Sequence, residues 1–156
     1  MTERIEMADA ELYEAVCKTV GRGEVFALIP KGRSMEPTVY SERQTVFLVS
    51  PDKIGRGDIV FYKRQSGKLI LHRIIKECDD GSFVMRGDSQ LKPEADVMPG
   101  QIFALVDSYT KKSGRLVRRG SFRYRADRLY ASVFTPVKSF LWRIASKIGI
   151  VKKNNG

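Results

Sequence analysis

The sequence has little histidine and cysteine: one His and two Cys occur among its 156 residues. Cys17 and Cys78 lie far apart, so their spacing fits neither a zinc site nor a disulfide-rich scaffold. We therefore expect two free thiols, as in a reducing compartment, and no metal or other cofactor. Any imidazole chemistry has to use the single histidine, His72, which as a residue type titrates near neutral pH.

Long apolar runs are also missing. No stretch of about 18 or more uncharged apolar residues occurs, so we expect no transmembrane helix. Residues 1–14 are acidic and lack the apolar segment of a secretory signal peptide. We therefore expect a cytoplasmic protein, with peripheral attachment to a membrane as an open alternative.

Acidic residues are scarce in the last part of the chain. Residues 111–156 contain thirteen Lys and Arg but one acid, Asp127, whereas residues 1–110 contain fifteen bases and seventeen acids. The excess positive charge therefore belongs to the last part, and an anionic partner should be sought there.

The texture of the sequence changes along the chain. Residues 7–20 have the apolar spacing of an amphipathic helix, and Gly21 and Gly23 close it. Residues 24–109 contain short runs rich in Val, Ile and Phe, separated by clusters of Gly, Asp and Pro. This pattern predicts an all-β domain with a coiled, barrel-like sheet. The runs are VFALIP, TVFLV, DIVFYK, LILHRII, SFVMRG and IFALVDSY.

The C-terminal part has helical signals. Ser121 and Thr135 are suited to be N-caps, and Pro136 suits the first position of a helix. One face of residues 136–148 is apolar and consists of Val137, Phe140, Leu141, Ile144 and Ile148.

These patterns predict a mainly β protein with three segments. Residues 1–23 form an N-terminal amphipathic helix, residues 24–113 a β-rich domain, and residues 114–156 a basic, helical tail. An apolar helix face flanked by cations suits an anionic membrane surface, here through residues 121–153. The alternative is that this face packs on the β domain or on a partner protein. Nucleic acid is less favoured, because no DNA-binding motif is present.

Ser34 lies in residues 32–38, GRSMEPT, which follow an apolar run after one residue. Glycine and proline fix the backbone on either side of this serine. Serines in such turns are common on protein surfaces, and most have no chemical role. A serine hydroxyl becomes a good nucleophile only when a base lies within hydrogen-bond reach.

His72 lies in the middle of an aliphatic run, where a histidine is more often a hydrogen-bonded core residue than a catalyst. It is nevertheless the best candidate for a general base, because it needs no large pKa shift. Lys63, Lys68 and Lys76 lie near the same run, but a lysine base has to be stripped of water. These three lie at or near turns, so we expect them to be solvated.

Four boxes in this order resemble the superfamily of type I signal peptidases and SOS-repressor peptidases. They are GRSMEPT, RGDIVFY, LHRII and RGDSQ, and the resemblance covers roughly residues 25–105. It implies Ser34 as the nucleophile and His72 as the base, as in the Ser/His branch. It also implies an assisting carboxylate, with Asp88 as the nearest match and Glu94 as the second. An Asp in a Gly-Asp turn otherwise needs no catalytic explanation.

The resemblance further implies a substrate-binding and oxyanion region around the serine, built by Gly32, Arg33, Met35 and Pro37 with the backbone N–H of Ser34. Gly32 stands where some relatives supply a hydroxyl donor, which glycine cannot do. Residues 41–44, SERQ, replace a Gly-Asp pair that is usual in the superfamily. We expect this difference to alter the local loop and to leave the chemistry intact.

The expected function is therefore a serine endopeptidase that cleaves a peptide or protein substrate, such as a leader or pro-sequence. The sequence resembles small members of the superfamily that lack the N-terminal membrane anchor. Two alternatives stay open. One is an autocleaving regulator, although about 23 residues before the first expected strand are too few for a DNA-binding domain. The other is a catalytically inert module that binds peptides.

Overall fold

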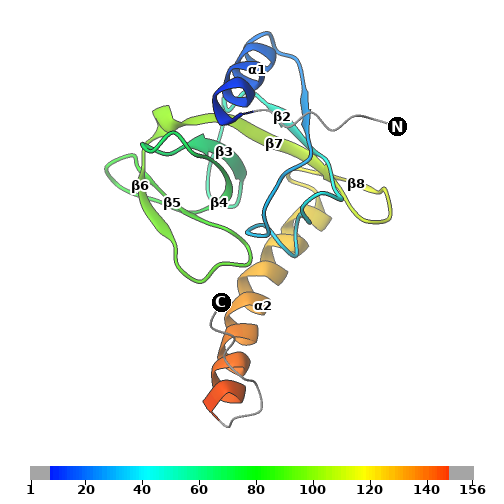
Figure 1. The fold of residues 1–156 in the computed structure, drawn as a ribbon, viewed down its shortest axis with the longest axis vertical. Helices are drawn as coiled ribbons and strands as arrows, with labels where there is room; N and C mark the ends of the chain where they lie inside the picture. Colours follow the sequence, from blue (N-terminus) through cyan, green and yellow to red (C-terminus); the bar gives the residue numbers. More distant parts are fainter. Residues whose placement is uncertain (1–7, 148–156) are drawn as a thin grey trace.

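The structure is a computed structural model, and it describes residues 8–147. In these residues it is mainly β, with two α-helices and one sheet of eight antiparallel strands (Figure 1). The mainly β prediction is thus confirmed. The helices are α1 (Asp9–Gly21) and α2 (Phe122–Lys147), and a 3-10 turn, η1, spans Pro99–Gln101. The strands are β1 (Phe26–Leu28), β2 (Val46–Val49), β3 (Ile59–Lys63), β4 (Leu69–Glu77), β5 (Phe83–Arg86), β6 (Glu94–Val97), β7 (Ile102–Thr110) and β8 (Leu116–Arg118).

The strands follow the order β1-β2-β7-β3-β4-β5-β6, and β8 pairs with β7. β1 and β6 each have one neighbour, so the sheet is not closed into a barrel. Pairing is irregular between Phe61 and Tyr62, where β3 meets β7, and between Ile74 and Lys76, where β4 meets β5. Such irregularities bend a strand and increase its twist, which agrees with the curled sheet in Figure 1.

Two apolar clusters occupy the two faces of the sheet. Ile59 and Phe61 of β3 join the cluster that α1 covers, whereas Val60 and Tyr62 join the other cluster. This alternation follows from the two-residue period of a strand. Since Val60 pairs with His72 on β4, the side chains of Tyr62 and His72 lie on the same face of the sheet.

The six apolar runs of the sequence correspond to β1–β5 and β7. The strands β6 and β8 were not predicted, because they are short and each buries a single side chain. The buried residue is Val97 in β6 and Val117 in β8. So short a polar segment carries no visible alternation, and pairing with a neighbouring strand decides its conformation. The expected N-terminal helix is α1, and neither Cys17 nor Cys78 forms a disulfide.

The C-terminal part forms one continuous helix, and the prediction of a new helix start at Thr135 and Pro136 was wrong. Pro136 lacks the N–H that would bond to the Ser132 carbonyl, yet α2 continues on both sides of it. One missing backbone bond thus does not end a helix of 26 residues. The N-cap at Ser121 agrees with the structure, because the Tyr124 N–H donates to Ser121 Oγ at 3.2 Å.

α2 is attached to the sheet at its beginning and then projects away from it (Figure 1). Tyr124, Asp127 and Ala131 are buried, and the Tyr109 hydroxyl donates to Asp127 at 2.6 Å. No helix in residues 8–147 is long and apolar enough to cross a membrane. Of the expected apolar face, the side chains of Leu141 and Ile144, together with Ile148, lie outside the described residues.

Candidate active site

A cleft of about 280 Å³ brings Ser34 and His72 together, although 37 residues separate them in the chain. One wall is the loop after β1, and the other is the first half of β4, from Leu69 to His72. Among the residues expected to bind substrate, Gly32, Arg33 and Met35 line this cleft, and Pro37 does not.

The loop that carries Ser34 is anchored by its neighbour. Met35 is 3% exposed and belongs to the apolar cluster under α1, whereas Arg33 on the other side is exposed. Gly32 has a φ of +83°, a left-handed conformation that glycine adopts without strain. Ser34 is therefore held at the border between the core and the cleft.

A second loop fixes the backbone of Ser34 from behind. The Ser89 N–H donates to the Ser34 carbonyl at 2.9 Å, and Ser89 Oγ lies 3.0 Å from the same oxygen. A Cβ on Gly87 would lie 2.6 Å from the Ser34 carbonyl oxygen, which is closer than atoms can approach. Glycine is thus required at position 87 for this loop to reach the serine.

Asp88 is buried beside this contact and belongs to an ion pair. Arg73 donates to its carboxylate at 2.8 and 2.6 Å, and the Thr38 hydroxyl donates to it at 2.5 Å. Burial lowers the pKa of Arg73, but the charge and hydrogen bonds of Asp88 outweigh this effect and raise it, so the guanidinium group keeps its charge. Arg73 and Thr38 thus hold the Asp88 carboxylate next to the loop that carries Ser34.

His72 is 3% exposed, and its Nδ1 lies 3.3 Å from the Tyr62 hydroxyl. That hydroxyl donates to Glu94 Oε2 at 2.8 Å, and Arg64 holds the same carboxylate through Nε at 2.9 and 3.0 Å. The side chains of Arg64, Glu94, Tyr62 and His72 therefore form a continuous polar chain that ends at the imidazole.

This chain sets the tautomer of His72. An ionised carboxylate only accepts hydrogen bonds, so the Tyr62 proton points to Glu94. The Tyr62 oxygen is then the acceptor toward His72, and Nδ1 of the imidazole carries the hydrogen. Nε2 is left with a lone pair, which is the form that a general base needs.

The pKa values agree with this arrangement. Burial lowers the pKa of His72 to about 4, and the negative charge of Glu94 opposes this effect only in part. Burial raises the pKa of Glu94, but hydrogen bonds from Arg64 and Tyr62 lower it by more, so the carboxylate is ionised. Burial and then Glu94 raise the pKa of Tyr62, which keeps its proton. At neutral pH the imidazole is therefore neutral.

Within the described part of the chain, neither Oγ nor the backbone N–H of Ser34 forms a hydrogen bond. No hydrogen bond therefore joins Ser34 to His72 in this structure. Catalytic hydrogen bonds often tighten only when substrate binds.

Of the three lysines near the His72 strand, Lys68 lines the cleft and is exposed, as expected for a solvated side chain. Lys63 lies over the ring of Tyr13, with Nζ 4.3 Å from the ring centroid. Lys76 is exposed and Lys63 is partly exposed, so none of the three lysines is stripped of water.

Sequence reasoning missed Tyr62 and Arg64. Their signal was present in the alternation of the β3 run, which puts Val60 and Tyr62 on one face. The short turn at residues 64–68 fixes the register of β3 against β4, and Tyr62 thereby lies diagonal to His72.

Among residues 8–147, no group of three or more His, Cys, Asp or Glu side chains could hold a metal ion. Comparisons with protein families and with curated proteins found no match to this sequence. A functional assignment therefore depends on the residues and on their arrangement.

For the serine-peptidase activity that the sequence leads us to expect, Tyr62→Phe should lower kcat/KM roughly a hundredfold, because His72 loses the partner that fixes its tautomer. The chain has one histidine, so ¹⁵N NMR reads this tautomer directly. The intact protein should show a hydrogen on Nδ1, and the variant a mixture of tautomers. Tyr40→Phe, which removes a hydroxyl outside the polar chain, is the matched control. A hydrogen on Nε2 in the intact protein would contradict this assignment.

Proposed function

We propose that this protein is a serine endopeptidase of the signal-peptidase type, with Ser34 as nucleophile and His72 as general base. The observation that carries the proposal is that Ser34 lines the same cleft as His72, and that Nδ1 of this histidine faces the Tyr62 hydroxyl, which is bound to Glu94. A buried, neutral histidine with its other nitrogen oriented by a polar partner is what activation of a serine requires.

The proposed reaction is acyl transfer. Ser34 Oγ attacks the scissile carbonyl carbon while Nε2 of His72 accepts the hydroxyl proton. The backbone N–H of Ser34 donates to the oxyanion, and the imidazolium returns its proton to the leaving amine. Water then repeats the sequence on the ester: it gives a proton to Nε2, its oxygen attacks the carbonyl carbon, and Ser34 leaves with that proton.

The assisting carboxylate is assigned to Glu94 and not to Asp88. Glu94 reaches the imidazole through the Tyr62 hydroxyl, and its charge favours the protonated imidazole that forms during the reaction. Asp88 has a supporting role, because Arg73 and Thr38 take up its carboxylate behind the serine loop.

The cleft suits a peptide in an extended conformation. β4 pairs with β3 along Leu69–Arg73, but β5 pairs with β4 only from Arg73 onward. The outer edge of Leu69–His72 therefore has no strand partner among the described residues, and these four residues line the cleft. A peptide can add to such an edge as a further strand, which presents its carbonyl groups in regular order.

A second candidate function is an inert peptide-binding module with the same edge. The missing hydrogen bond between Ser34 and His72 favours it. A mixed peptide library, incubated with the purified chain and read by mass spectrometry, decides between the two. New peptide termini that appear with the intact protein and not with Ser34→Ala support the peptidase. Peptide binding without new termini supports the inert module.

A further inference from the structure

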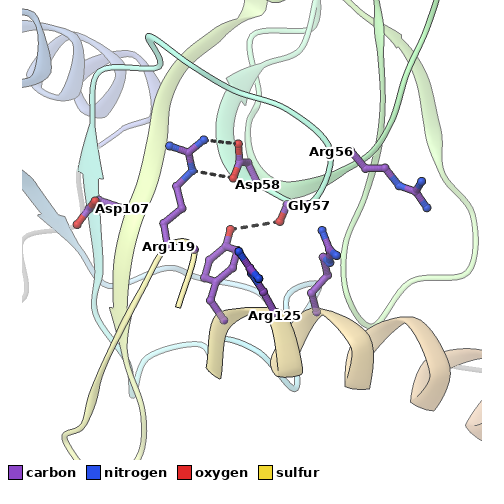
Figure 2. Close-up of a pocket in the computed structure, with 9 residues that line it drawn as sticks. Arg56, Gly57, Asp58, Asp107, Arg119 and Arg125 are labelled. Atoms are coloured by element: carbon purple, nitrogen blue, oxygen red, sulfur yellow. Dashed lines mark hydrogen bonds and ion pairs between the residues drawn. The ribbon is translucent and has the colours of Figure 1, made fainter. Parts of the chain in front are cut away.

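A second pocket, of about 350 Å³, lies away from the catalytic cleft and shares no residue with it. It is formed by the loop before β3, the segment after β8 and the first turns of α2 (Figure 2). Four arginines line it: Arg56, Arg119, Arg125 and Arg128.

Three of these four arginines carry uncompensated charge. Arg119 is neutralised by Asp58, to which it donates from two nitrogens at 2.7 Å each. Arg56, Arg125 and Arg128 pair with no carboxylate within residues 8–147. Asp107 is the one further acid in the lining and is exposed. In Figure 2 the guanidinium groups of Arg56 and Arg125 are free of dashed contacts, whereas Arg119 is turned to Asp58.

The floor of this arginine pocket is held together by hydrogen bonds of Tyr124. Tyr124 is buried, donates to the Gly57 carbonyl at 3.2 Å and accepts from the Ile59 N–H at 3.1 Å. Arg128 lies so close to Gly57 that a side chain at position 57 would collide with its guanidinium group. Gly57 has a φ of +103°, so glycine is favoured there for two reasons.

These features fit a phosphate group. A guanidinium fork matches phosphate oxygens in pairs, and its charge does not titrate. Here the free forks come from two separate elements, the loop at Arg56 and the helix at Arg125 and Arg128. A tetrahedral anion has oxygens in several directions and can accept from more than one of these guanidinium groups, whereas a planar carboxylate offers two oxygens.

The same helix carries an exposed apolar stripe, which indicates where such a phosphate is found. Phe122 is 87% exposed and Phe140 64% exposed, so this face is not covered by the β domain. The spacing of the stripe puts its members on one side of α2. Its members with described side chains are Phe122, Leu129, Val133, Val137 and Phe140.

We propose that the arginine pocket binds the phosphate of an anionic phospholipid, and that the exposed stripe of α2 lies in the lipid surface beside it. Basic residues next to an apolar helix face are the usual combination of interfacial helices. The pocket adds a defined phosphate site to that general attraction, on a surface that the peptidase cleft does not use.

The test uses the intact chain and vesicles of phosphatidylcholine with or without phosphatidylglycerol, in a flotation assay. The chain should bind only the vesicles with phosphatidylglycerol. Arg56→Gln, Arg125→Gln and Arg128→Gln together should weaken this binding about a hundredfold. The matched control, Arg22→Gln, Arg43→Gln and Lys92→Gln, removes the same charge from exposed positions outside the pocket. It should stay within about threefold of the intact chain, since distant charges are screened.

Two further measurements separate the sources of phosphate. Phe122→Ser with Phe140→Ser should weaken vesicle binding and leave binding of soluble glycerol phosphate unchanged. If the pocket variant and its control lose vesicle binding equally, the proposed phosphate site in the pocket is wrong. Binding of glycerol phosphate without vesicle binding would overturn the lipid source. If the chain self-associates through the stripe and does not bind vesicles, the proposal is wrong and the stripe is covered by a second copy of the chain. Melting temperatures show that each variant is folded.

Discussion

Ser34→Ala is expected to lower kcat/KM for peptide cleavage by about 10⁴-fold or more, because no other group replaces the nucleophile. The residual rate would come from the oxyanion site and from binding alone. The cleaved peptide is first chosen from a library by the intact protein. Ser66→Ala, in the exposed turn between β3 and β4, is the matched control and should keep full activity.

The same variant should fold and bind normally. Ser34 Oγ forms no hydrogen bond with the described residues, whereas the Ser34 carbonyl, which Ser89 binds, is unchanged by the substitution. The melting temperature and the Kd for an uncleaved peptide should therefore match those of the intact protein. A variant that cleaves at the normal rate would contradict the assignment of the nucleophile, and a variant that loses peptide binding would point to a structural role.

His72→Gln is expected to lower kcat/KM by a similar factor, since glutamine fills much of the same space but accepts no proton at neutral pH. In the intact protein, the acid limb of kcat/KM should fall near pH 4, the pKa of the buried imidazole. A histidine exposed to water would put this limb near pH 6.5. An acid limb at that higher pH would contradict the buried, neutral base.

His72→Gln should also change how stability depends on pH. The pKa of His72 is about 4 in the folded chain and about 6.5 in the unfolded chain, so the unfolded state binds more protons between these values. The free energy of unfolding is therefore unaffected by this group above about pH 6.5. It falls by about 3 kcal/mol as the pH drops to about 4. Urea unfolding at several pH values should show this loss in the intact protein and a smaller one in the variant.

The local pattern of apolar residues was enough to predict the strands that bury apolar side chains. Six runs became strands, because each has enough Val, Ile or Phe to specify a buried face. The segments around Glu94 and Val117 were missed, since their pairing with β5 and β7 supplies what their sequence does not. At Pro136 the sequence indicated a helix boundary. Helix formation is cooperative, however, and the long helix α2 continues past this proline.

The two central residues of the candidate site were predictable from the sequence, but the contacts that hold them in place were not. Ser34 and His72 lie in recognisable boxes, and both line the cleft. The connection from Glu94 through Tyr62 depends on the register of β3 against β4, and the burial of Asp88 against Arg73 depends on how two loops meet. No spacing in the sequence encodes such contacts, and this is why the sequence alone left both carboxylates open.

The central claim is that Ser34 is a nucleophile activated by His72, and covalent labelling tests it most directly. The intact protein is treated with a fluorophosphonate or a penem, and the modified peptide is identified by mass spectrometry. We predict one adduct, on Ser34, that forms far more slowly in His72→Gln and is absent in Ser34→Ala. An adduct that persists in Ser34→Ala, or that forms at the same rate without His72, would contradict the proposed mechanism.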